Sequence, residues 1–506
     1  MRKVRNNLPV LLLTICIIIT AIITNVYAVP KEQQAASQKV IKSLQANVKQ
    51  LDIYQGEKNN LLKKIKITAV YSDGTKKDIT GQVAFSCKNA SQVSLDGNVV
   101  QGISPGSATL MINFGKLKSS VRLSIKAVPV VLIPGTMGSN LVDADTNRKL
   151  WLSISQSDME KLILPENGEL PASGQAGSNI RPTTILDDGS GIPQLDFYSS
   201  FETSLKLAGY KVEAFPYDWR LDVDRNADRL GELLKTLAKK YNTDKFSVVA
   251  HSQGGLIAKR YLQRSIKPIP GMKNVNPGKV KIGKLILAGV PQYGTPIAFN
   301  SWFTGKVAAL DSPLMASLIS YDTLKRVINN SPAVYEMFPS KKYFSSYAEN
   351  GINADRFSTE SSDSKIKDNY KTMAEWIGEG KSFNKQLYNK FISLYEGKNG
   401  LNSLDLFSAN TSKYADVYII AGFGFNTAAT IDKGKFYYLT GDGTVPLLSA
   451  TAGKLKGEKI KYVKNANHGA LLKDRRVINE ISNILSEKAS DAAGILKSPG
   501  ELRKSR

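Results

Sequence analysis

The chain has 506 residues, of which 42% are hydrophobic and 22% are charged, and its formal net charge is +24 at pH 7. This length exceeds one ordinary domain, and the composition is typical of a globular protein with a large core. The positive charge favours anionic envelope polymers or lipid headgroups over nucleic acid if the chain is exported, or it simply keeps the surface soluble. We therefore expect no nucleic-acid partner.

The first 28 residues have the three parts of a Sec-type signal peptide. Three basic residues precede residue 6, an apolar run extends from Leu8 to Ile23, and the small-residue sequence "VYA" ends at Ala28. We therefore predict a signal over 1–28 and a secreted or envelope-associated protein outside the cytoplasm. The apolar run approaches the length of a membrane span, so an uncleaved anchor is the alternative.

The chain has only two cysteines, and Cys16 lies within the predicted signal. Cys87 would then remain alone, and no intramolecular disulfide could form. Small secreted domains often depend on disulfides. We expect a large core to take their place here.

Residues 50–127 consist of short alternating runs separated by turn signals, and the polar stretch before them, 29–49, is typical of a linker. The run "LLKKIKITAVY" alternates apolar and polar residues, and "SDG" and "LDGN" indicate hairpin turns. This spacing predicts a small all-β sandwich. The segment resembles the bacterial immunoglobulin-like domain, group 2, in "YSDGTKKDIT", "VSLDGNVVQG" and "GSATL". The resemblance implies an adhesive or spacer module.

From residue 128 to 486 the pattern changes to continuous apolar runs that each end in a loop: "PVVLIPG", "KFSVVAHSQGG", "KLILAGVPQYGTP", "ADVYIIAGFG" and "EKIKYVKNANHG". Helix-like patterns such as "ADRLGELLKTLAKKY" lie between several of them. Such alternation predicts an α/β domain with a mostly parallel sheet covered on both faces, and a ligand site beyond the carboxyl ends of its strands.

Two stretches of the chain after residue 128 lack this alternation of apolar runs and helix-like patterns. Between about residues 299 and 410 the strand pattern stops, and helix-like stretches rich in aromatic residues predict a helical cap over the site. We interpret those aromatic residues mainly as packing between helices, with direct lipid contact as the alternative. The last residues, 487–506, are rich in Ala, Lys and Arg and predict a basic tail.

Ser252 stands in "AHSQGG", between a predicted strand and a predicted helix. A nucleophilic serine at such an elbow needs small residues two positions before and after it, and Ala250 and Gly254 occupy these positions. The more common residue at the first of them is glycine. By itself this pentapeptide is weak evidence, because a small polar residue between two elements is the ordinary alternative.

A nucleophilic serine needs a base, and the chain has only two histidines, His251 and His468. His251 is adjacent to Ser252, and neighbouring side chains diverge at a sharp elbow. We therefore predict that His468, in the loop "NANHGALL", is the base. An incidental loop histidine is the alternative, but the scarcity of histidine disfavours it.

The acid is expected between the serine and the histidine, because α/β domains with a nucleophilic serine at a strand–helix elbow place their triad residues in the chain order Ser, Asp or Glu, His. Asp442, in "YLTGDGTVP", has the right position upstream of His468. An Asp-Gly pair is more often only a turn. Asp416 and Asp432 are the competing acids.

An acyl-transfer site also needs backbone N–H groups that stabilise the oxyanion. Gln253, the residue after the serine, is expected to supply one. The other is expected from the loop "IPGTMGSN", whose glycines let the backbone approach closely. Thr136, or Met137 beside it, is then the donor.

Taken together, these motifs resemble the lecithin:cholesterol acyltransferase family of the α/β-hydrolase fold from about residue 129 to 484. The resemblance is carried by "VVLIPGTMGSNL", "FPYDWRLD", "VVAHSQGG", "GDGTVPLLS" and "NANHGALL", with "SPAVYEMFPS" as a looser match. It implies Ser252 as nucleophile, Asp442 as acid and His468 as base. It also implies a secreted enzyme that removes ester-linked acyl chains from lipids, with water or an alcohol as acceptor.

Met137 and Trp151 are candidate substrate contacts, and packing is an equal alternative for Trp151. The scarcity of histidine predicts no metal centre built on histidine, and no cofactor is expected. The segments "DADTN" and "DVDRN" begin like a calcium loop but lack its later Gly and Glu.

The leading hypothesis is therefore a serine esterase, phospholipase or acyltransferase whose substrate is a lipid or a membrane surface. One alternative keeps the chemistry but acts on acetylated polysaccharides of the cell envelope, to which the basic surface and the immunoglobulin-like module would bind. Another is a non-catalytic adhesin that uses the hydrolase fold as a scaffold.

Overall fold

The computed structural model describes residues 39–88, 91–175, 177–185, 198–276, 280–307, 320–349, 383–432, 435–455, 457–488 and 494–496. The predicted signal peptide lies outside these residues. The chain divides into two compact units, the first holding residues up to 52, 59–100 and 107–124, and the second holding the rest. Within the described ranges, no helix combines the length and the apolar character needed to cross a bilayer.

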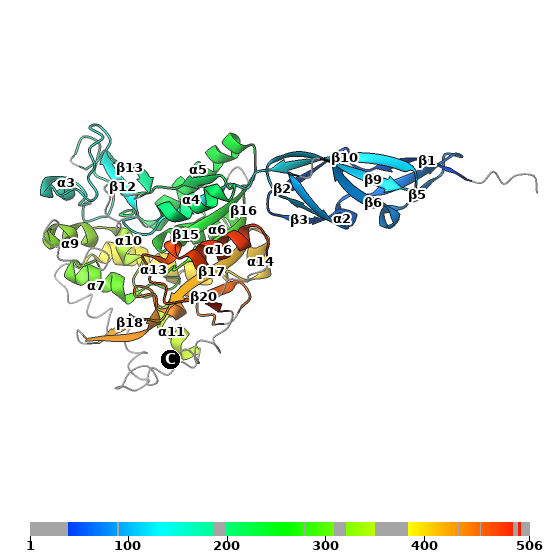
Figure 1. Cartoon of the computed structure of the whole chain (residues 1–506). Coiled ribbons are helices and arrows are strands. Elements are labelled where there is room, and N and C mark those ends of the chain that lie inside the picture. The colour runs from blue at the N-terminus through cyan, green and yellow to red at the C-terminus, as the bar shows by residue number, and fades with distance from the viewer. Residues whose placement is uncertain are drawn as a thin grey trace, which may run out of the picture. The chain divides into compact units, whose positions relative to one another are not determined.

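The first unit is rich in β-structure, as predicted. Its sheets have the strand orders β1-β4-β5, β2-β10-β9-β6 and β3-β8-β7 (Figure 1). Leu110 and Ile112 on β9, and Val121 and Leu123 on β10, are fully buried while the residues between them are more exposed. This period of two is that of strands with one buried face. The resemblance to an immunoglobulin-like domain stays a prediction.

The elements of this region have the following bounds: β1 Ile41–Ala46, β2 Gln50–Tyr54, β3 Lys58–Asn60, α2 Leu61–Lys64, β4 Ile67–Tyr71, β5 Lys76–Asp78, η2 Thr80–Gln82, β6 Ala84–Lys88, β7 Val93–Asp96, β8 Val99–Gly102, β9 Gly106–Phe114 and β10 Leu117–Lys126.

Strand β1 lies inside the stretch 29–49 that the sequence assigned to a linker, so that boundary was wrong. The strand pairs antiparallel with β4, with Ala46 opposite Ile67. It forms the edge of its sheet, and Leu44 is its only buried residue. Because an edge strand exposes most of its side chains to water, its composition does not differ from that of a polar linker.

The second unit is centred on a seven-stranded sheet with the order β14-β11-β15-β16-β17-β20-β21. The strands from β14 to β20 are parallel, and in the middle of the sheet Val249 of β15 lies opposite Leu132 of β11 and Ile286 of β16. Their bounds are β14 Val212–Ala214, β11 Val130–Ile133, β15 Lys245–His251, β16 Lys281–Ala288, β17 Asp416–Phe423, β20 Ile460–Lys464 and β21 Ile495–Leu496.

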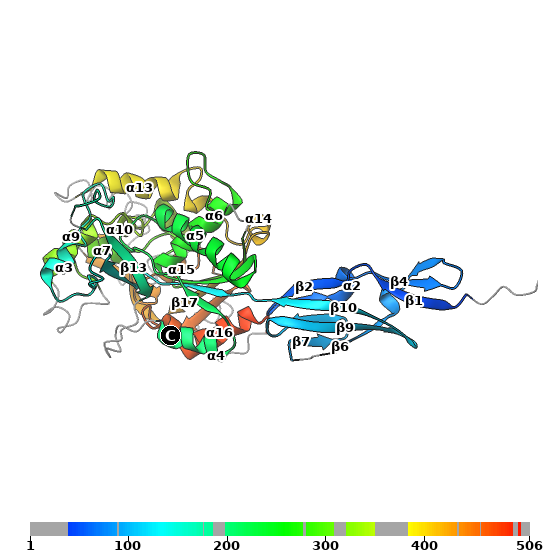
Figure 2. The same ribbon diagram turned by 90° about the horizontal axis from the view of Figure 1, so that it is seen from above.

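Helices cover both faces of this sheet, which explains the continuous apolar runs in its strands. Along β11, Val130 and Leu132 pack into one hydrophobic cluster, and Val131 and Ile133 pack into another on the opposite face. Figure 2 shows α4 and α16 on one side of the sheet and α5 and α6 on the other. These helices are α4 Ser199–Leu207, α5 Val223–Tyr241, α6 Gln253–Ile266 and α16 Arg475–Leu485.

The described parts of the predicted cap are helical. Trp302 donates a hydrogen bond from Nε1 to Tyr335 Oη at 2.9 Å, and Phe338 packs edge-on against Trp302. These aromatic side chains are buried among the helices, which is the packing role favoured by the sequence. The elements here are α7 Pro296–Thr304, α9 Tyr321–Asn329, α10 Pro332–Tyr335, α11 Lys341–Glu349, α13 Lys385–Glu396, η5 Leu401–Ser403 and α14 Ala409–Ser412.

Smaller elements complete the unit, namely β12 Ser139–Asp143, α3 Gln156–Glu160, β13 Ile180–Ile185, β18 Phe425–Asp432, β19 Lys435–Gly441, α15 Leu447–Ala450 and η6 Leu471–Lys473. The two-residue strand β21 belongs to the stretch 487–506 that was predicted to be only a tail, and it pairs antiparallel with β20. Two residues are too few for their period to identify a strand, so β21 could not be predicted from the sequence.

Helix α6 is buried along most of its length and includes a lysine. The side chain of Lys259 is 1% exposed, and its Nζ lies 6.0 Å from the centroid of the Tyr293 ring. Burial lowers the pKa of Lys259 to about 7, because removal from water disfavours the charged amine. Near neutral pH this amine is therefore charged in the unfolded chain and only partly charged in the folded one.

Replacing Lys259 by methionine should stabilise the protein more at pH 7 than at pH 9.5. Between about pH 7 and the ordinary lysine pKa, the unfolded chain binds more protons than the folded protein, so this group makes the free energy of unfolding rise with pH. The slope is at most about 1.4 kcal/mol per pH unit. Urea unfolding of the parent protein and of Lys259→Met at pH 7 and at pH 9.5 measures the stabilisation at each pH. A variant whose stability relative to the parent is the same at both pH values would contradict the expectation.

Candidate active site

Ser252 occupies a strained turn between β15 and α6. Its φ of 53° and ψ of −127° lie in a region that side-chain-bearing residues rarely adopt, as expected for a nucleophile elbow. The N–H of Ser252 donates to the carbonyl oxygen of Ala288 at 3.0 Å, which fixes the turn to the carboxyl end of β16. The serine is 7% exposed.

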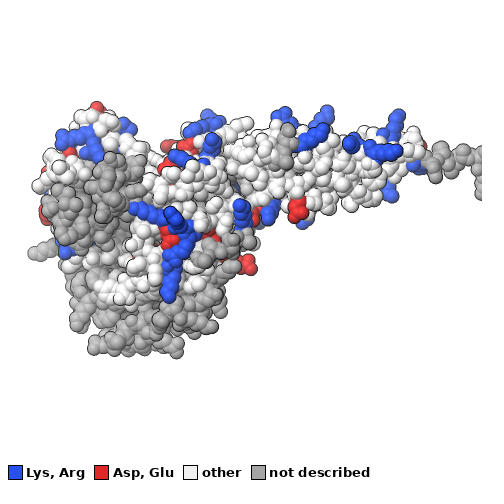
Figure 3. Space-filling model, in the orientation of Figure 1, with Lys and Arg blue, Asp and Glu red and all other residues white. Residues whose placement is uncertain are grey.

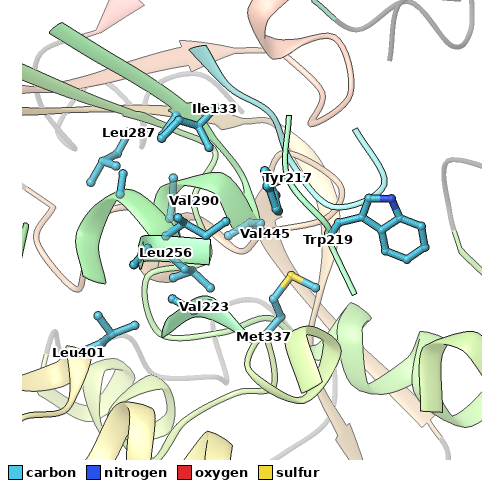
Figure 4. Packing of buried hydrophobic residues seen from close by; sticks show 14 of the residues in the cluster. Ile133, Tyr217, Trp219, Val223, Leu256, Leu287, Val290, Met337, Leu401 and Val445 are labelled. Carbon is cyan, nitrogen blue, oxygen red and sulfur yellow. The ribbon is translucent and has the colours of Figure 1, made fainter. Parts of the chain in front are cut away.

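The small residues around the elbow are needed because other backbone passes close by. A Cβ on Gly254 would lie 2.3 Å from the carbonyl oxygen of Pro134, and one on Gly255 would lie 2.1 Å from Cγ2 of Val290. Val290 packs in the core beside Leu256 (Figure 4). The sequence pattern of small residues therefore has a direct steric cause.

Replacing Gly254 by alanine should lower the free energy of unfolding by about 1–3 kcal/mol, the usual cost of overpacking a core. The new methyl group would displace the loop after β11, so hydrolysis of a soluble ester should fall as well. Gly457 is a matched control, since a Cβ there meets nothing closer than 3.5 Å. Equal stability of the Gly254→Ala and Gly457→Ala variants in urea unfolding would show that the close contact is absent.

The structure brings the side chains of Ser252, His468 and Asp442 together. His468 Nε2 lies 2.9 Å from Ser252 Oγ, and His468 Nδ1 lies 2.8 Å from Asp442 Oδ2. A carboxylate only accepts hydrogen bonds, so Nδ1 carries the proton and Nε2 is free to accept the proton of the serine. This is the geometry of a Ser–His–Asp triad.

Asp442 is held in place by its own turn. Its other oxygen, Oδ1, accepts the N–H of Val445 at 2.7 Å and the N–H of Thr444 at 3.0 Å. Its backbone carbonyl accepts the N–H of His468 at 2.9 Å. The carboxylate is 1% exposed, so these donors stabilise its charge in place of water.

The competing acids lie elsewhere. Asp416 begins β17, at the amino end of that strand, where it pairs with Lys459 and accepts a hydrogen bond from Tyr418 Oη at 2.9 Å. Asp432 ends β18 in a separate hairpin. Parallel strands carry the site at their carboxyl ends, so position along the strand separates Asp416 from Asp442.

Two glycines that the sequence analysis did not single out make room for the histidine and the acid. A Cβ on Gly289, after β16, would lie 3.1 Å from Asp442 Oδ2 and 3.3 Å from His468 Nδ1. A Cβ on Gly422, in β17, would lie 2.4 Å from the carbonyl oxygen of Ala466. Both glycines stand at carboxyl ends of core strands, and that position is the signal by which they could have been found.

The loop predicted to complete the oxyanion site lies against the serine. A Cβ on Gly135 would lie 2.9 Å from Cβ of Ser252, so the backbone approach inferred from this glycine is present. Thr136 and Met137 follow it and are partly exposed. Gln253 begins α6, and the first N–H groups of a helix have no intrahelical acceptor. Both predicted donors thus flank Ser252, and their role in binding an oxyanion stays a prediction.

Of the two candidate substrate contacts, only Met137 reaches the surface. Trp151 is 1% exposed, packs edge-on against Trp219 at 4.8 Å between centroids, and donates from Nε1 to the carbonyl oxygen of Met137 at 2.9 Å. Packing is therefore the role that the structure shows for Trp151. Through this bond it holds the loop that contains Thr136.

The motif "FPYDWRLD" is structural. Arg220 and Asp218 form a fully buried ion pair, with 2.6 Å between Nη2 and Oδ2, and Arg220 Nη1 donates to the carbonyl oxygen of Leu162 at 2.9 Å. Tyr217 Oη donates to the carbonyl oxygen of Pro134 at 3.0 Å, on the loop that leads to Thr136. Tyr217 and Trp219 belong to the hydrophobic cluster of buried residues that Figure 4 shows.

A metal-ligand cluster of three or more His, Cys, Asp or Glu side chains is absent from the described residues. The arrangement that is present, a hydroxyl, an imidazole and a carboxylate in a hydrogen-bonded series, supports nucleophilic acyl transfer.

A parallel sheet with helices on both faces, and a serine at the sharp turn between β15 and α6, defines the α/β-hydrolase fold. Residues 176–392 match the family model "Lecithin:cholesterol acyltransferase". The resemblance predicted from the sequence is therefore confirmed over this part of the chain, which includes Ser252 but ends before Asp442 and His468.

Known proteins with similar sequences match short parts of the chain. An uncharacterized protein of Saccharomyces cerevisiae is 31% identical over 148 residues, which are 28% of this chain and 22% of that protein. Lecithin-cholesterol acyltransferase-like 4 of Arabidopsis thaliana is 26% identical over 160 residues, which are 26% of this chain and 30% of that protein. The match thus spans less than a third of the length of either relative.

Among solved structures, the mature form of the Bacillus licheniformis lipase BlEst2 aligns with a TM-score of 0.31 and 12% sequence identity, and the alignment covers 71% of this chain and 92% of that one.

Proposed function

We propose that this protein is an exported esterase that removes ester-linked acyl chains from lipids through an acyl-enzyme on Ser252. The observation that carries the proposal is the pair of contacts on His468, 2.9 Å to Ser252 Oγ and 2.8 Å to Asp442 Oδ2. The family match over residues 176–392 favours a lipid ester as substrate.

In the proposed reaction, Ser252 Oγ attacks the carbonyl carbon of the ester while its proton passes to His468 Nε2. Asp442 stabilises the imidazolium that forms. The tetrahedral oxyanion accepts hydrogen bonds from the backbone N–H groups of Gln253 and Thr136. The proton on Nε2 then passes to the oxygen of the leaving alcohol, and the acyl group stays on Oγ.

The second half of the reaction uses the same groups. Water gives a proton to His468 Nε2 and attacks the acyl carbon, which releases a carboxylic acid and restores Ser252. If an alcohol takes the place of water, the product is a new ester and the protein acts as an acyltransferase. The balance between the two depends on how well the closed site excludes water.

Apolar side chains beside the site support an acyl chain as the group transferred. Met137 is partly exposed next to Thr136, and Met337 places its Sδ 3.3 Å from Thr136 Oγ1. Thioether side chains are flexible and adapt to apolar ligands of different shape. A lipid chain would lie against them when its ester carbonyl faces the amide of Thr136.

The second candidate is an esterase that acts on acetylated polysaccharides of the cell envelope, and the charge of the N-terminal β-rich region suits it equally well. Residues 39–126 contain fourteen Lys and Arg but five Asp and Glu. In the view of Figure 3, blue Lys and Arg side chains are more frequent than red acidic ones on this region. Such a surface would attract anionic envelope polymers as well as anionic lipid headgroups.

Incubation with defined phospholipids, with and without an added alcohol, separates these candidates when the products are measured by mass spectrometry. Release of fatty acid, or of a new ester when alcohol is present, is the expected result. Activity confined to short-chain or sugar acetates would favour the polysaccharide esterase. A chain that neither hydrolyses esters nor reacts with a fluorophosphonate probe would be a scaffold, and the proposal would be wrong.

A further inference from the structure

His251 has no part in the proposed reaction, yet both of its ring nitrogens are engaged beside the site. Its Nε2 lies 3.1 Å from the backbone carbonyl oxygen of His468, and its Nδ1 lies 3.0 Å from Tyr198 Oη. The same phenol oxygen accepts the N–H of Gly135 at 2.7 Å. His251 therefore stands between the loop of the catalytic histidine and the loop that carries Thr136.

The partners fix the direction of every hydrogen bond in this series. A backbone carbonyl only accepts, so His251 Nε2 must carry the proton and donate to His468. In a neutral ring, Nδ1 is then an acceptor and receives the phenol proton of Tyr198. Tyr198 donates its one proton to this nitrogen, and its oxygen accepts the N–H of Gly135 at 2.7 Å.

The surroundings keep the groups in these protonation states. His251 is 5% exposed and Tyr198 is 3% exposed. Burial, together with the His468 ring 4.7 Å away between centroids, holds the pKa of His251 well below its usual value, so its ring is neutral near pH 7. Burial also raises the pKa of Tyr198 above the ordinary value, so the phenol keeps its proton.

The series joins two pieces of backbone that must keep a fixed distance from Ser252. One carries His468, whose ring must stay within hydrogen-bond reach of Oγ. The other carries Thr136, whose N–H must face the oxyanion. Small errors of placement in an active site lower the rate strongly, and a group that ties both loops to the elbow limits such errors.

We propose that His251 is a positioning residue. Together with Tyr198, it holds the His468 loop and the Gly135 loop at fixed distances from Ser252. This inference rests on the proposed function. It assigns a task to the histidine that sequence reasoning excluded only as the base. Neither residue needs to touch the substrate.

Three variants test the inference: His251→Leu, which removes both ring hydrogen bonds, Tyr198→Phe, which removes the phenol, and the double variant. Tyr414→Phe is the matched control, since Tyr414 is 40% exposed and precedes the amino end of β17, whereas the site lies at the carboxyl ends of the strands. Rates on p-nitrophenyl butyrate are divided by the folded fraction, measured by circular dichroism, so that loss of fold does not count as loss of activity.

We expect each single variant to lower kcat by about tenfold or more with little change in KM, and to slow labelling by a fluorophosphonate to a similar degree. The loss in the double variant should be smaller than the product of the two single losses, because Tyr198 acts in part through the His251 ring. His251→Gln, whose amide N–H reaches toward the His468 carbonyl, should recover part of kcat relative to His251→Leu.

Two results would overturn the inference: kcat of folded His251→Leu within twofold of the parent, or single effects that multiply in full in the double variant. Ser252→Ala, assayed in parallel, separates this failure from failure of the proposed function. If Ser252→Ala is inactive while His251→Leu is fully active, only the positioning role is wrong. If Ser252→Ala retains activity, the proposed function itself is wrong.

Discussion

Replacing Ser252 by alanine should lower the turnover of a lipid ester by about six orders of magnitude, the loss typical of a serine triad that acts as a unit. The variant lacks the oxygen that attacks the carbonyl and accepts the acyl group. What remains is the binding of the oxyanion by backbone amides, which alone gives only modest catalysis. Stability should change little, because alanine meets the same backbone strain at φ 53°.

The measurement is kcat/KM on a phospholipid and on a soluble ester, with Ser412→Ala as control. Ser412 is an exposed serine at the end of α14, and its removal should leave the rate unchanged. If Ser252→Ala retains a rate close to that of the parent while Ser412→Ala does not, the nucleophile has been assigned to the wrong place.

Replacing Asp442 by asparagine should lower kcat by about four orders of magnitude. The amide can present an N–H to His468 Nδ1, which favours the tautomer with the proton on Nε2, and that nitrogen then cannot accept the proton of Ser252. The fold should persist, because an asparagine oxygen can still accept the N–H groups of Val445 and Thr444 that bind Oδ1 in the parent.

Asp416→Asn is the control for this prediction, since Asp416 was one of the two competing acids and lies at the amino end of β17, away from the carboxyl ends of the strands where the site lies. Its loss should affect the pair with Lys459 and leave kcat within a few fold of the parent. A larger loss of kcat in Asp416→Asn than in Asp442→Asn would contradict the placement of the acid. Steady-state kinetics of both variants at one pH decides between them.

The positions of Ser252, His468 and Asp442 could be predicted because each is constrained by chain order and local sequence. Ser252 lies between a strand and a helix with small neighbours, and the steric reason for those neighbours appears at Gly254. Histidine is so rare that His468 was the only base free to reach the serine. The family resemblance then separated Asp442 from the other acids.

The contacts around the triad could not be predicted, because they depend on distances between residues far apart in the chain. Tyr198 and His251 are 53 positions apart, and no local pattern links them. The burial of Trp151 depends on Trp219, which lies 68 residues later in the sequence. Strand β1 could not be predicted for a different reason. An edge strand with one buried side chain has the composition of a linker.

The role of Ser252 as nucleophile is tested most directly by covalent labelling of the full chain with a fluorophosphonate, followed by peptide mass spectrometry. We expect a single adduct, on the peptide that contains Ser252, formed at a rate that falls sharply in His468→Ala. An adduct on a different serine, or ester hydrolysis that continues after Ser252 is fully labelled, would contradict it.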